Sequence, residues 1–172
     1  KALFSPSEWK LLLNAPQWIY AALTAAERGS IATRRNEAKA LQKFLASYKT
    51  NSPLVKEIIA GQDEADDKVK GSLKDAEKTL AQVGTLLDRK AGGDEGDAVR
   101  DFLKEAGEAI AGATREALIG DRLSRKEEEA LASIEAALKA TEADKERRKK
   151  TAQAKAERDA RHARELKARA EA

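Results

Sequence analysis

The hydrophobic and polar positions of this chain repeat at helical spacing over most of its length. Apolar residues recur every three or four positions, which places them on one face of an α-helix. Ser, Gly and Pro interrupt the pattern where helices are expected to begin and end. The predicted helices cover about 6–15, 16–27, 33–49, 53–60, 63–90, 97–118 and the residues that follow Ser124. We therefore predict an all-α protein that folds as a helical bundle.

The first predicted helix carries a strong start signal. Ser5 is placed to cap it, Pro6 suits the first helical position, and Glu8 completes a capping box. Phe4 and Trp9 have the spacing of a hydrophobic staple. We expect these residues to fix the point at which the chain enters the bundle.

The segment 16–27 is apolar on nearly all sides, which is typical of a helix in the centre of a core. Its Trp18–Tyr20 cluster also suits a membrane interface, but a buried helix is the simpler interpretation. The most apolar window, Leu11–Ala26, is too short and too interrupted by polar residues and proline to span a bilayer. We expect no membrane partner.

Residues 63–90 combine a long apolar seam with two glycines. The seam advances in steps of three and four residues through Val69, Leu73, Ala76, Leu80, Val83 and Leu87. Such steps predict one helix that packs lengthwise on a neighbour. Gly71 and Gly84 each weaken it by about 1 kcal/mol relative to Ala. The following Ala91–Gly96 is the clearest loop signal in the body of the chain.

From Asp121 to Ala172 the chain has neither Gly nor Pro, and Ser124 with Glu127 forms a capping-box pattern near its start. An apolar seam follows, made of Ala130, Leu131, Ile134, Ala137 and Leu138. Beyond the seam, Ala and charged residues predominate. The pattern predicts a long C-terminal helix whose first third packs on the bundle and whose remainder extends into solvent. We place a helical bundle domain at 1–140 and a charged helical extension at 141–172.

The positive charge of the chain is concentrated in that extension. Residues 141–172 contain 11 Lys or Arg against 7 Asp or Glu, a net charge of +4, whereas the remainder has 22 against 23, a net charge of −1. The candidate contacts with a partner or with nucleic acid are Arg147, Arg148, Lys149, Lys150, Lys155, Arg158, Arg161, Arg164, Lys167 and Arg169. Three interpretations stay open: a self-supported charged helix that acts as a spacer, a coiled-coil partner helix, and a nucleic-acid contact.

The two ends of the body resemble a known family. The opening Phe4–Trp9 and the Ala15-Pro16 pair are similar to the start of an uncharacterised family of small bacterial all-helical proteins, which begin Phe-Ser/Thr-Pro-x-Glu-Trp. The segment Gly120–Glu127 is similar to that family's second landmark, and the resemblance covers about 4–140. The layout is also distantly similar to TerB-like (tellurite-resistance) domains, but the turn at Ala26–Gly29 lacks their acidic character. The resemblance implies an all-helical fold and neither an activity nor a metal site.

Few side chains in this chain are suited to catalysis. There is no Cys, and the one His, His162, has no second His with which to bind a metal. The acidic clusters Asp63–Asp67 and Asp94–Asp97 offer oxygen ligands for a divalent cation, but acidic residues in a first helical turn also interact with the helix dipole. Gly92-Gly93 lacks the spacing of a phosphate-binding loop, so we interpret it as a turn.

These observations favour a non-catalytic interaction or structural protein, without a cofactor, in the cytoplasm. We expect it to contact a protein partner, or a second copy of itself, through the extension or through a face of the bundle. The alternative is a non-specific nucleic-acid-binding protein that uses the basic extension. A third interpretation, an enzyme with a metal bound by the carboxylates of Asp63–Asp67, has less support.

Overall fold

The computed structural model divides the chain into two units, Lys1–Lys139 and Ala140–Ala172. The structure describes residues 2–26, 31–66, 69–117, 124–139, 146, 149–151 and 153–162, apart from the side chains of 32 and 114–117. Each unit is considered by itself below.

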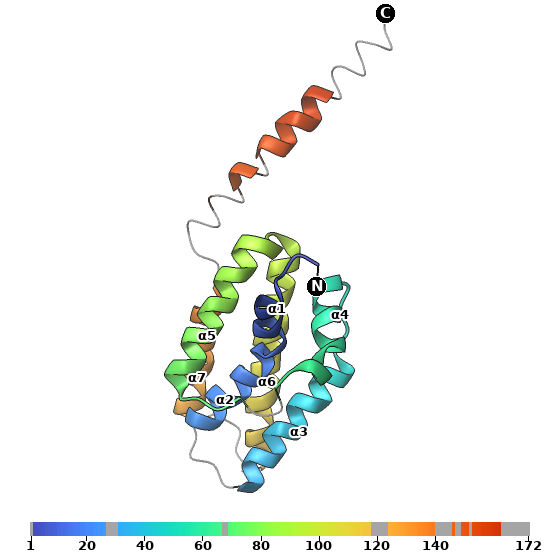
Figure 1. Ribbon diagram of the computed structural model, residues 1–172. Helices are drawn as coiled ribbons and strands as arrows, with labels where there is room; N and C mark the ends of the chain where they lie inside the picture. The colour runs from blue at the N-terminus through green and yellow to red at the C-terminus, as the bar shows by residue number, and fades with distance from the viewer. Residues whose placement is uncertain are drawn as a thin grey trace, which may run out of the picture. The chain divides into compact units, whose positions relative to one another are not determined.

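The described part of the first unit is built from helices (Figure 1). They are α1 Pro6–Leu13, α2 Ala15–Ala26, α3 Ile31–Ser47, α4 Pro53–Ala60, the 3₁₀ helix η1 Gln62–Glu64, α5 Leu73–Leu86, the π-helical turn η2 Leu87–Ala91, α6 Asp94–Ala117 and α7 Arg125–Leu138. The prediction of an all-α bundle is confirmed. Within the described residues, no helix is both long and apolar enough to cross a membrane.

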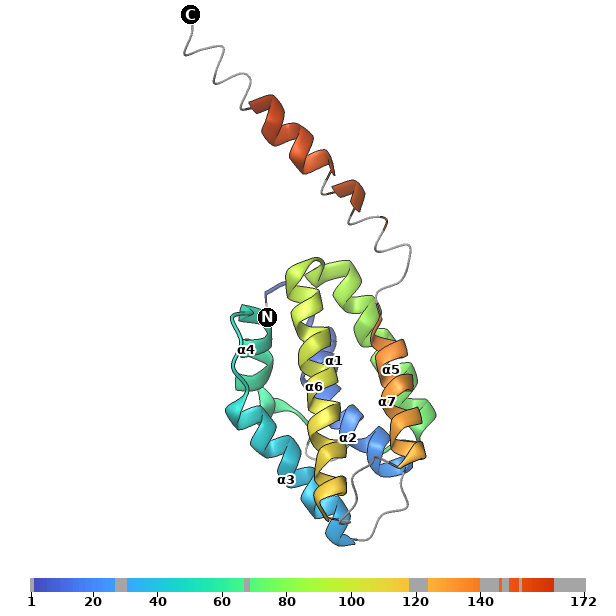
Figure 2. The same ribbon diagram turned by 180° about the vertical axis from the view of Figure 1, so that it is seen from behind.

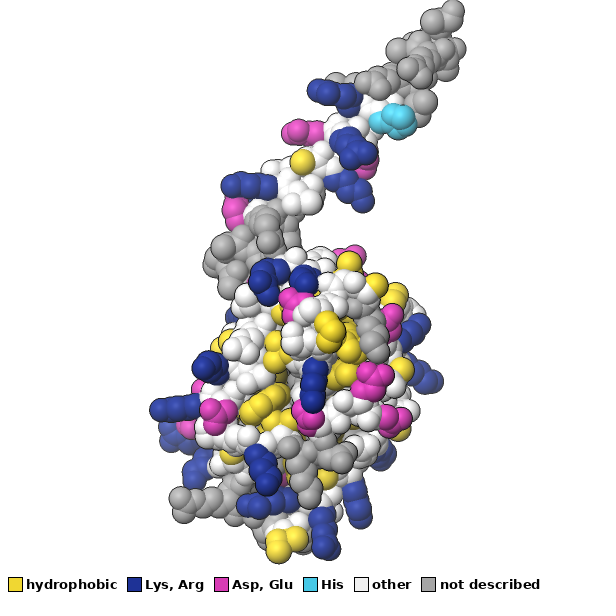
Figure 3. Space-filling view, viewed as in Figure 1, with side chains coloured by type: hydrophobic (Ala, Val, Ile, Leu, Met, Phe, Trp, Pro, Cys, Tyr) yellow, Lys and Arg dark blue, Asp and Glu magenta, His cyan; other side chains and the backbone are white. Residues whose placement is uncertain are grey.

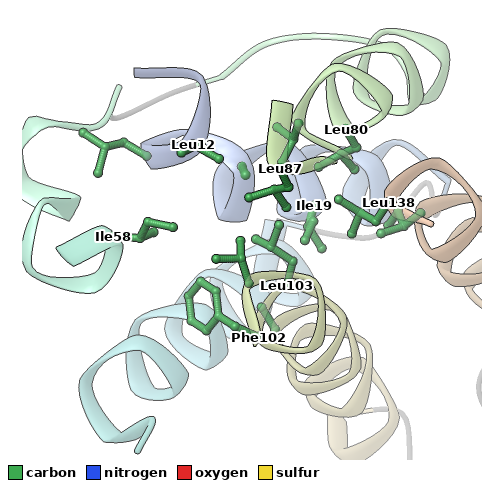
Figure 4. Close-up of a cluster of buried hydrophobic side chains, with 14 of the residues drawn as sticks. Leu12, Ile19, Ile58, Leu80, Leu87, Phe102, Leu103 and Leu138 are labelled. Atoms are coloured by element: carbon green, nitrogen blue, oxygen red, sulfur yellow. The ribbon is translucent and has the colours of Figure 1, made fainter. Parts of the chain in front are cut away.

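Helix α2 occupies the centre of the bundle, in contact with α1, α3, α5, α6 and α7. Helix α3 lies along α6, and α5 packs between α2 and α7 (Figures 1 and 2). Side chains from most of these elements converge in one aliphatic core (Figure 4), which includes Leu12, Ile19, Ile58, Leu80, Leu87, Phe102, Leu103 and Leu138. Ile19 is fully buried, so α2 is the core helix that its composition predicts.

The start of α1 has the predicted geometry. The Glu8 amide donates to Ser5 Oγ over 3.3 Å, and the Ser5 amide donates to Glu8 Oε2 over 2.8 Å. The rings of Phe4 and Trp9 lie 6.2 Å apart, and both residues are buried. The capping box and the staple are therefore confirmed, and together they anchor the N-terminal end of the bundle.

The single helix predicted for 63–90 is wrong at its start, because α5 begins only at Leu73. Ser72 caps α5 through its own capping box with Asp75. Upstream, the Asn14 side chain donates to Asp66 Oδ2 and accepts from the Asp66 amide, each over 2.8 Å. Because the Asp66 amide donates to the Asn14 side chain, the backbone at Asp66 is bonded to the end of α1 and does not form the hydrogen bond of a continuing helix.

The loop predicted at Ala91–Gly96 is also shorter than expected. Helix α6 begins at Asp94, so that only Gly92 and Gly93 form the turn after η2. Gly93 has φ of +74°, a left-handed conformation that suits glycine.

Helix α7 begins after the predicted cap at Ser124, but it ends at Leu138, where Lys139 adopts an extended conformation with ψ of 136°. The long C-terminal helix predicted to begin at Ser124 is therefore interrupted at Lys139. The extension of the remaining residues into solvent stays a prediction.

The helical glycines Gly84 and Gly112 differ in their surroundings, which leads to opposite predictions. A Cβ at Gly84 would lie 3.0 Å from the Ala137 carbonyl oxygen, whereas one at Gly112 would meet nothing within 4 Å. We expect Gly84→Ala to lower the unfolding free energy by about 1–3 kcal/mol, because α5 and α7 must separate. Gly112→Ala should raise it by about 0.5–1 kcal/mol through helix propensity. Urea unfolding followed by circular dichroism measures the unfolding free energy of both variants. Changes of the same sign in the two variants would contradict the close packing of α5 on α7.

Candidate interaction site

A largely buried guanidinium group lies at the end of the bundle. The Arg100 side chain, 11% exposed, pairs with the carboxylate of Asp88 on η2. It also donates to Asp97 Oδ1 over 3.0 Å, to the Leu138 carbonyl over 2.7 Å and to the Gly84 carbonyl over 3.3 Å. We call these five residues the Arg100 cluster. It joins α5, η2, α6 and α7 through one cation.

The Arg100 cluster explains the end of α7. In a helix that continued, the Leu138 carbonyl would accept from the amide of residue 142; instead it accepts from Arg100 Nε. A cation is also favoured at a helix C-terminus, where the unpaired carbonyl groups carry partial negative charge. Arg100 therefore caps α7 from another helix, and the C-terminal unit starts directly after that cap.

In the C-terminal unit, the described residues 146, 149–151 and 153–162 are helical and exposed. Of the predicted contact residues, Lys149, Lys150, Lys155, Arg158 and Arg161 belong to this described set. Arg147, Arg148, Arg164, Lys167 and Arg169 lie outside the described residues. The described set contains a loose ion pair between Lys150 and Glu146, with a 3.7 Å separation.

Four of the five described basic residues gather on one side of their helix; Lys149 lies outside that side. At 100° per residue, Lys150, Lys155, Arg158 and Arg161 fall within a sector of about 140°. Glu157 and Asp159 fall just outside its two edges by the same spacing. In Figure 3 dark blue side chains predominate along this helix beside the cyan His162, whereas both signs are mixed over the visible face of the bundle. The segment thus presents a cationic stripe along one side of this helix.

The acidic cluster at Asp63–Asp67 is engaged within the fold. Asp66 forms an ion pair of 2.9 Å with Lys10, besides its bonds to Asn14. The hydrogen bonds from Lys10 and Asn14 hold the pKa of the Asp66 carboxyl below its usual range. Asp63 and Glu64 lie exposed on η1, and Asp67 is outside the described residues. Nowhere in the described ranges do three or more His, Cys, Asp or Glu side chains gather as a metal site.

The second acidic cluster, Asp94–Asp97, has structural partners. Glu95 Oε2 accepts from Ser52 Oγ over 2.7 Å and from the Leu54 amide over 3.1 Å. It thereby fastens the N-terminus of α4 to the start of α6. Asp97 belongs to the Arg100 cluster.

A groove between α3 and α6, which the sequence patterns do not predict, has a volume of about 700 Å³. Its lining is Asn36, Lys39, Ala40, Lys43, Phe44 and Ser47 from α3, and Ala109, Gly112 and Ala113 from α6. We call it the α3–α6 groove. The α3 residues that line the groove recur at i, i+3 and i+4, which indicates that they share one face of a helix. This spacing does not reveal the opposite wall on α6, which lies 60 or more residues away in the sequence.

Comparison of the chain with protein-family models, with curated proteins and with solved structures found no match. Of the resemblance to the bacterial helical family and to TerB-like domains, only the small all-helical architecture is supported.

The unfolding free energy should fall in acid because carboxylates are engaged in the folded state. The bonds that Glu8 accepts from Lys90 and Ser5 lower its pKa from 4.5 to about 2. The contribution of Glu8 to the unfolding free energy is therefore complete above pH 4.5, the ordinary pKa of this carboxyl group. It is lost as the pH falls toward the folded-state pKa of about 2. Thermal melts across this range should show a flatter pH profile for Glu8→Gln than for the unaltered protein. Glu128→Gln, at another exposed carboxylate, is the control, and an identical profile for both variants would contradict the assignment.

Removal of the Arg100 guanidinium should destabilise the bundle and lengthen α7. We expect Arg100→Gln to lower the unfolding free energy by about 3–5 kcal/mol, because Asp88 is left buried without its cation. Carbon chemical shifts at Lys139 should move toward helical values once the Leu138 carbonyl is released. Lys104→Gln is the matched control: its ion pair with Glu135 is about half exposed, so its loss should cost less than about 1 kcal/mol. An unchanged shift at Lys139 would show that something other than Arg100 ends the helix.

Proposed function

We propose that this chain is a non-catalytic interaction protein of the cytoplasm. In this proposal the bundle of residues 1–139 is a support, and the segment 140–172 contacts a protein partner or a second copy of the chain. The observation that carries the proposal is the different use of charged side chains in the two units.

In the bundle, several charged groups link one helix to another. Lys90 pairs with Glu8 over 2.6 Å and thereby joins η2 to α1, and Lys104 pairs with Glu135 over 3.2 Å and thereby joins α6 to α7. The Arg100 cluster is the buried example. The charged groups in these contacts therefore hold helices of the bundle together.

In the C-terminal unit, exposed cations lie on one side of a helix. Lys155, Arg158 and Arg161 have no ion pair within the described residues. Exposed charges that support no internal contact are available to an external partner, and they set its preferred charge. A partner with an acidic surface therefore fits this segment best.

A nucleic-acid contact is the second candidate, favoured by the sector of about 140° that holds four basic residues. The absence of any aromatic residue from 141–172 favours phosphate contacts over base stacking. The carboxylate-metal enzyme has the least support, because the Asp66 oxygens are bonded to Lys10 and Asn14.

The test compares two full-length variants with the same loss of charge. One carries Lys149→Gln, Lys150→Gln, Lys155→Gln, Arg158→Gln and Arg161→Gln; the matched control carries Arg35→Gln, Lys49→Gln, Lys56→Gln, Lys74→Gln and Lys126→Gln, all exposed on the bundle. A photo-crosslinking residue replaces Ala154, which lies within the basic sector, or the exposed Ala60 of α4. In the parent and in the bundle control, we expect a nuclease-resistant protein adduct from position 154 and none from position 60. In the C-terminal variant, we expect at least tenfold less adduct from position 154.

The same proteins are then titrated against labelled duplex DNA and RNA between about 50 and about 200 mM salt. Binding that weakens with salt and disappears in the C-terminal variant alone would make nucleic acid the partner. If the five C-terminal substitutions change neither adduct formation nor nucleic-acid binding, both candidates are overturned.

A further inference from the structure

The α3–α6 groove lies on the bundle and needs none of residues 140–172. Helix α3 turns Leu41 and Leu45 into the core, while its neighbouring face lines the groove. In Figure 2, α3 lies beside α6. From Asn36 to Ser47 the α3 wall spans 12 residues, about 16 Å for the 11 steps at 1.5 Å each. That length corresponds to three turns of a helix laid alongside.

The floor of the groove is apolar and firm. Ala40, Ala109 and Ala113 line it with small side chains, and nothing lies within 4 Å of the position where Gly112 would carry a Cβ. Phe44 is half-buried and is held by ring contacts, with its centroid 5.6 Å from that of Phe102. A floor of this kind admits the apolar stripe of an amphipathic helix, a common mode of peptide recognition.

The groove lining itself carries positive charge only. Lys39 and Lys43 are the charged residues of its lining; they lie one turn apart, exposed, without an ion pair among the described residues. Helix α3 carries one acidic residue, Glu37, which is only 2% exposed and accepts from Thr24 Oγ1 inside the bundle. The outward charge of α3 is therefore entirely positive, although the body of the chain has a net charge of −1.

We propose that the α3–α6 groove docks an acidic amphipathic helix of a partner protein. The apolar stripe of that helix lies against Ala40, Phe44 and Gly112, and its acidic residues, one turn apart, pair with Lys39 and Lys43. Phosphate groups of a nucleic acid or a lipid surface would satisfy the two lysines but would leave the apolar floor uncovered, so a protein helix fits both features.

The experiment titrates the full-length protein with two labelled model peptides of about 18 residues, longer than the ~12–15 at which isolated helices become stable. Both carry Leu at alternating spacings of three and four; one has Glu on the flanks of the Leu stripe and the other has Lys there. We expect fluorescence anisotropy to show at least tenfold tighter binding of the Glu peptide. Lys39→Glu/Lys43→Glu should reverse the preference, whereas Lys56→Glu/Lys74→Glu, exposed elsewhere on the bundle, should preserve it.

A second variant tests the floor without a change of charge. A Cβ at Gly112 would meet nothing within 4 Å, so we expect Gly112→Leu to fold and to bind the Glu peptide at least tenfold more weakly. Equal binding of the two peptides, or binding that neither groove variant alters, would overturn the proposal. So would Lys39- and Lys43-dependent binding of duplex DNA or anionic vesicles that Gly112→Leu leaves unchanged.

The variant with five Gln in the C-terminal unit separates this proposal from the preceding one. It should bind the Glu peptide as the parent does, because its groove is intact. Loss of peptide binding in that variant would assign the interaction to the C-terminal cations and would overturn the groove as its site.

Discussion

One buried cation holds together the end of the bundle from which the C-terminal unit departs. Arg100 lies where the backbone carbonyls of Gly84 and Leu138 meet the carboxylate of Asp88. Burial removes water as a partner for such acceptors, so a charged donor placed among them stabilises this end of the bundle. The guanidinium group supplies several donors in a fixed geometry, which a lysine ammonium does not reproduce. A single side chain therefore links α5, α6 and α7, in addition to their packing in the core.

Small residues allow the same helices to approach closely. Gly84 faces the backbone of Ala137, and Gly107 faces Leu131, whose Cδ2 lies 3.0 Å from the position a Cβ would take. With such contacts the aliphatic core closes around α2 although aromatic residues make up only 4% of the chain. Its few large rings are used locally: Phe44, Tyr48 and Phe102 form one aromatic group between α3 and α6, with Phe44 at the edge of the groove.

Among the described residues, positive charge gathers on two surfaces in particular. One is the outer side of α3, where Lys39 and Lys43 border an apolar groove. The other is the helix that contains Lys155 and Arg158, on which described apolar side chains are no larger than Ala. The chemistry of the two surfaces differs accordingly. The groove suits a partner with an apolar stripe between acidic residues, whereas the C-terminal helix suits a partner recognised by charge alone.

Local signals determined where several helices begin. Ser5, Ser52 and Ser124 cap α1, α4 and α7 through hydrogen bonds that span three residues, so their pattern is readable in the sequence. The all-α class and most of the buried seam, such as Leu80 and Ile134, follow equally from spacing along the chain. The basic composition of the C-terminal segment, the source of the candidate contacts, is likewise a property of the sequence alone.

Contacts between distant residues decided the rest. The chain is held at Asp66 by Asn14, 52 residues earlier, and α7 stops at Leu138 because of Arg100, 38 residues earlier. Neither contact leaves a local pattern, since the helical propensity around Leu138 favours continuation. The α3–α6 groove belongs to the same class, because it exists only once the two helices have packed. Capping and periodicity act over three or four residues and can be read from a sequence, whereas a helix end or a groove made by another helix requires the tertiary structure.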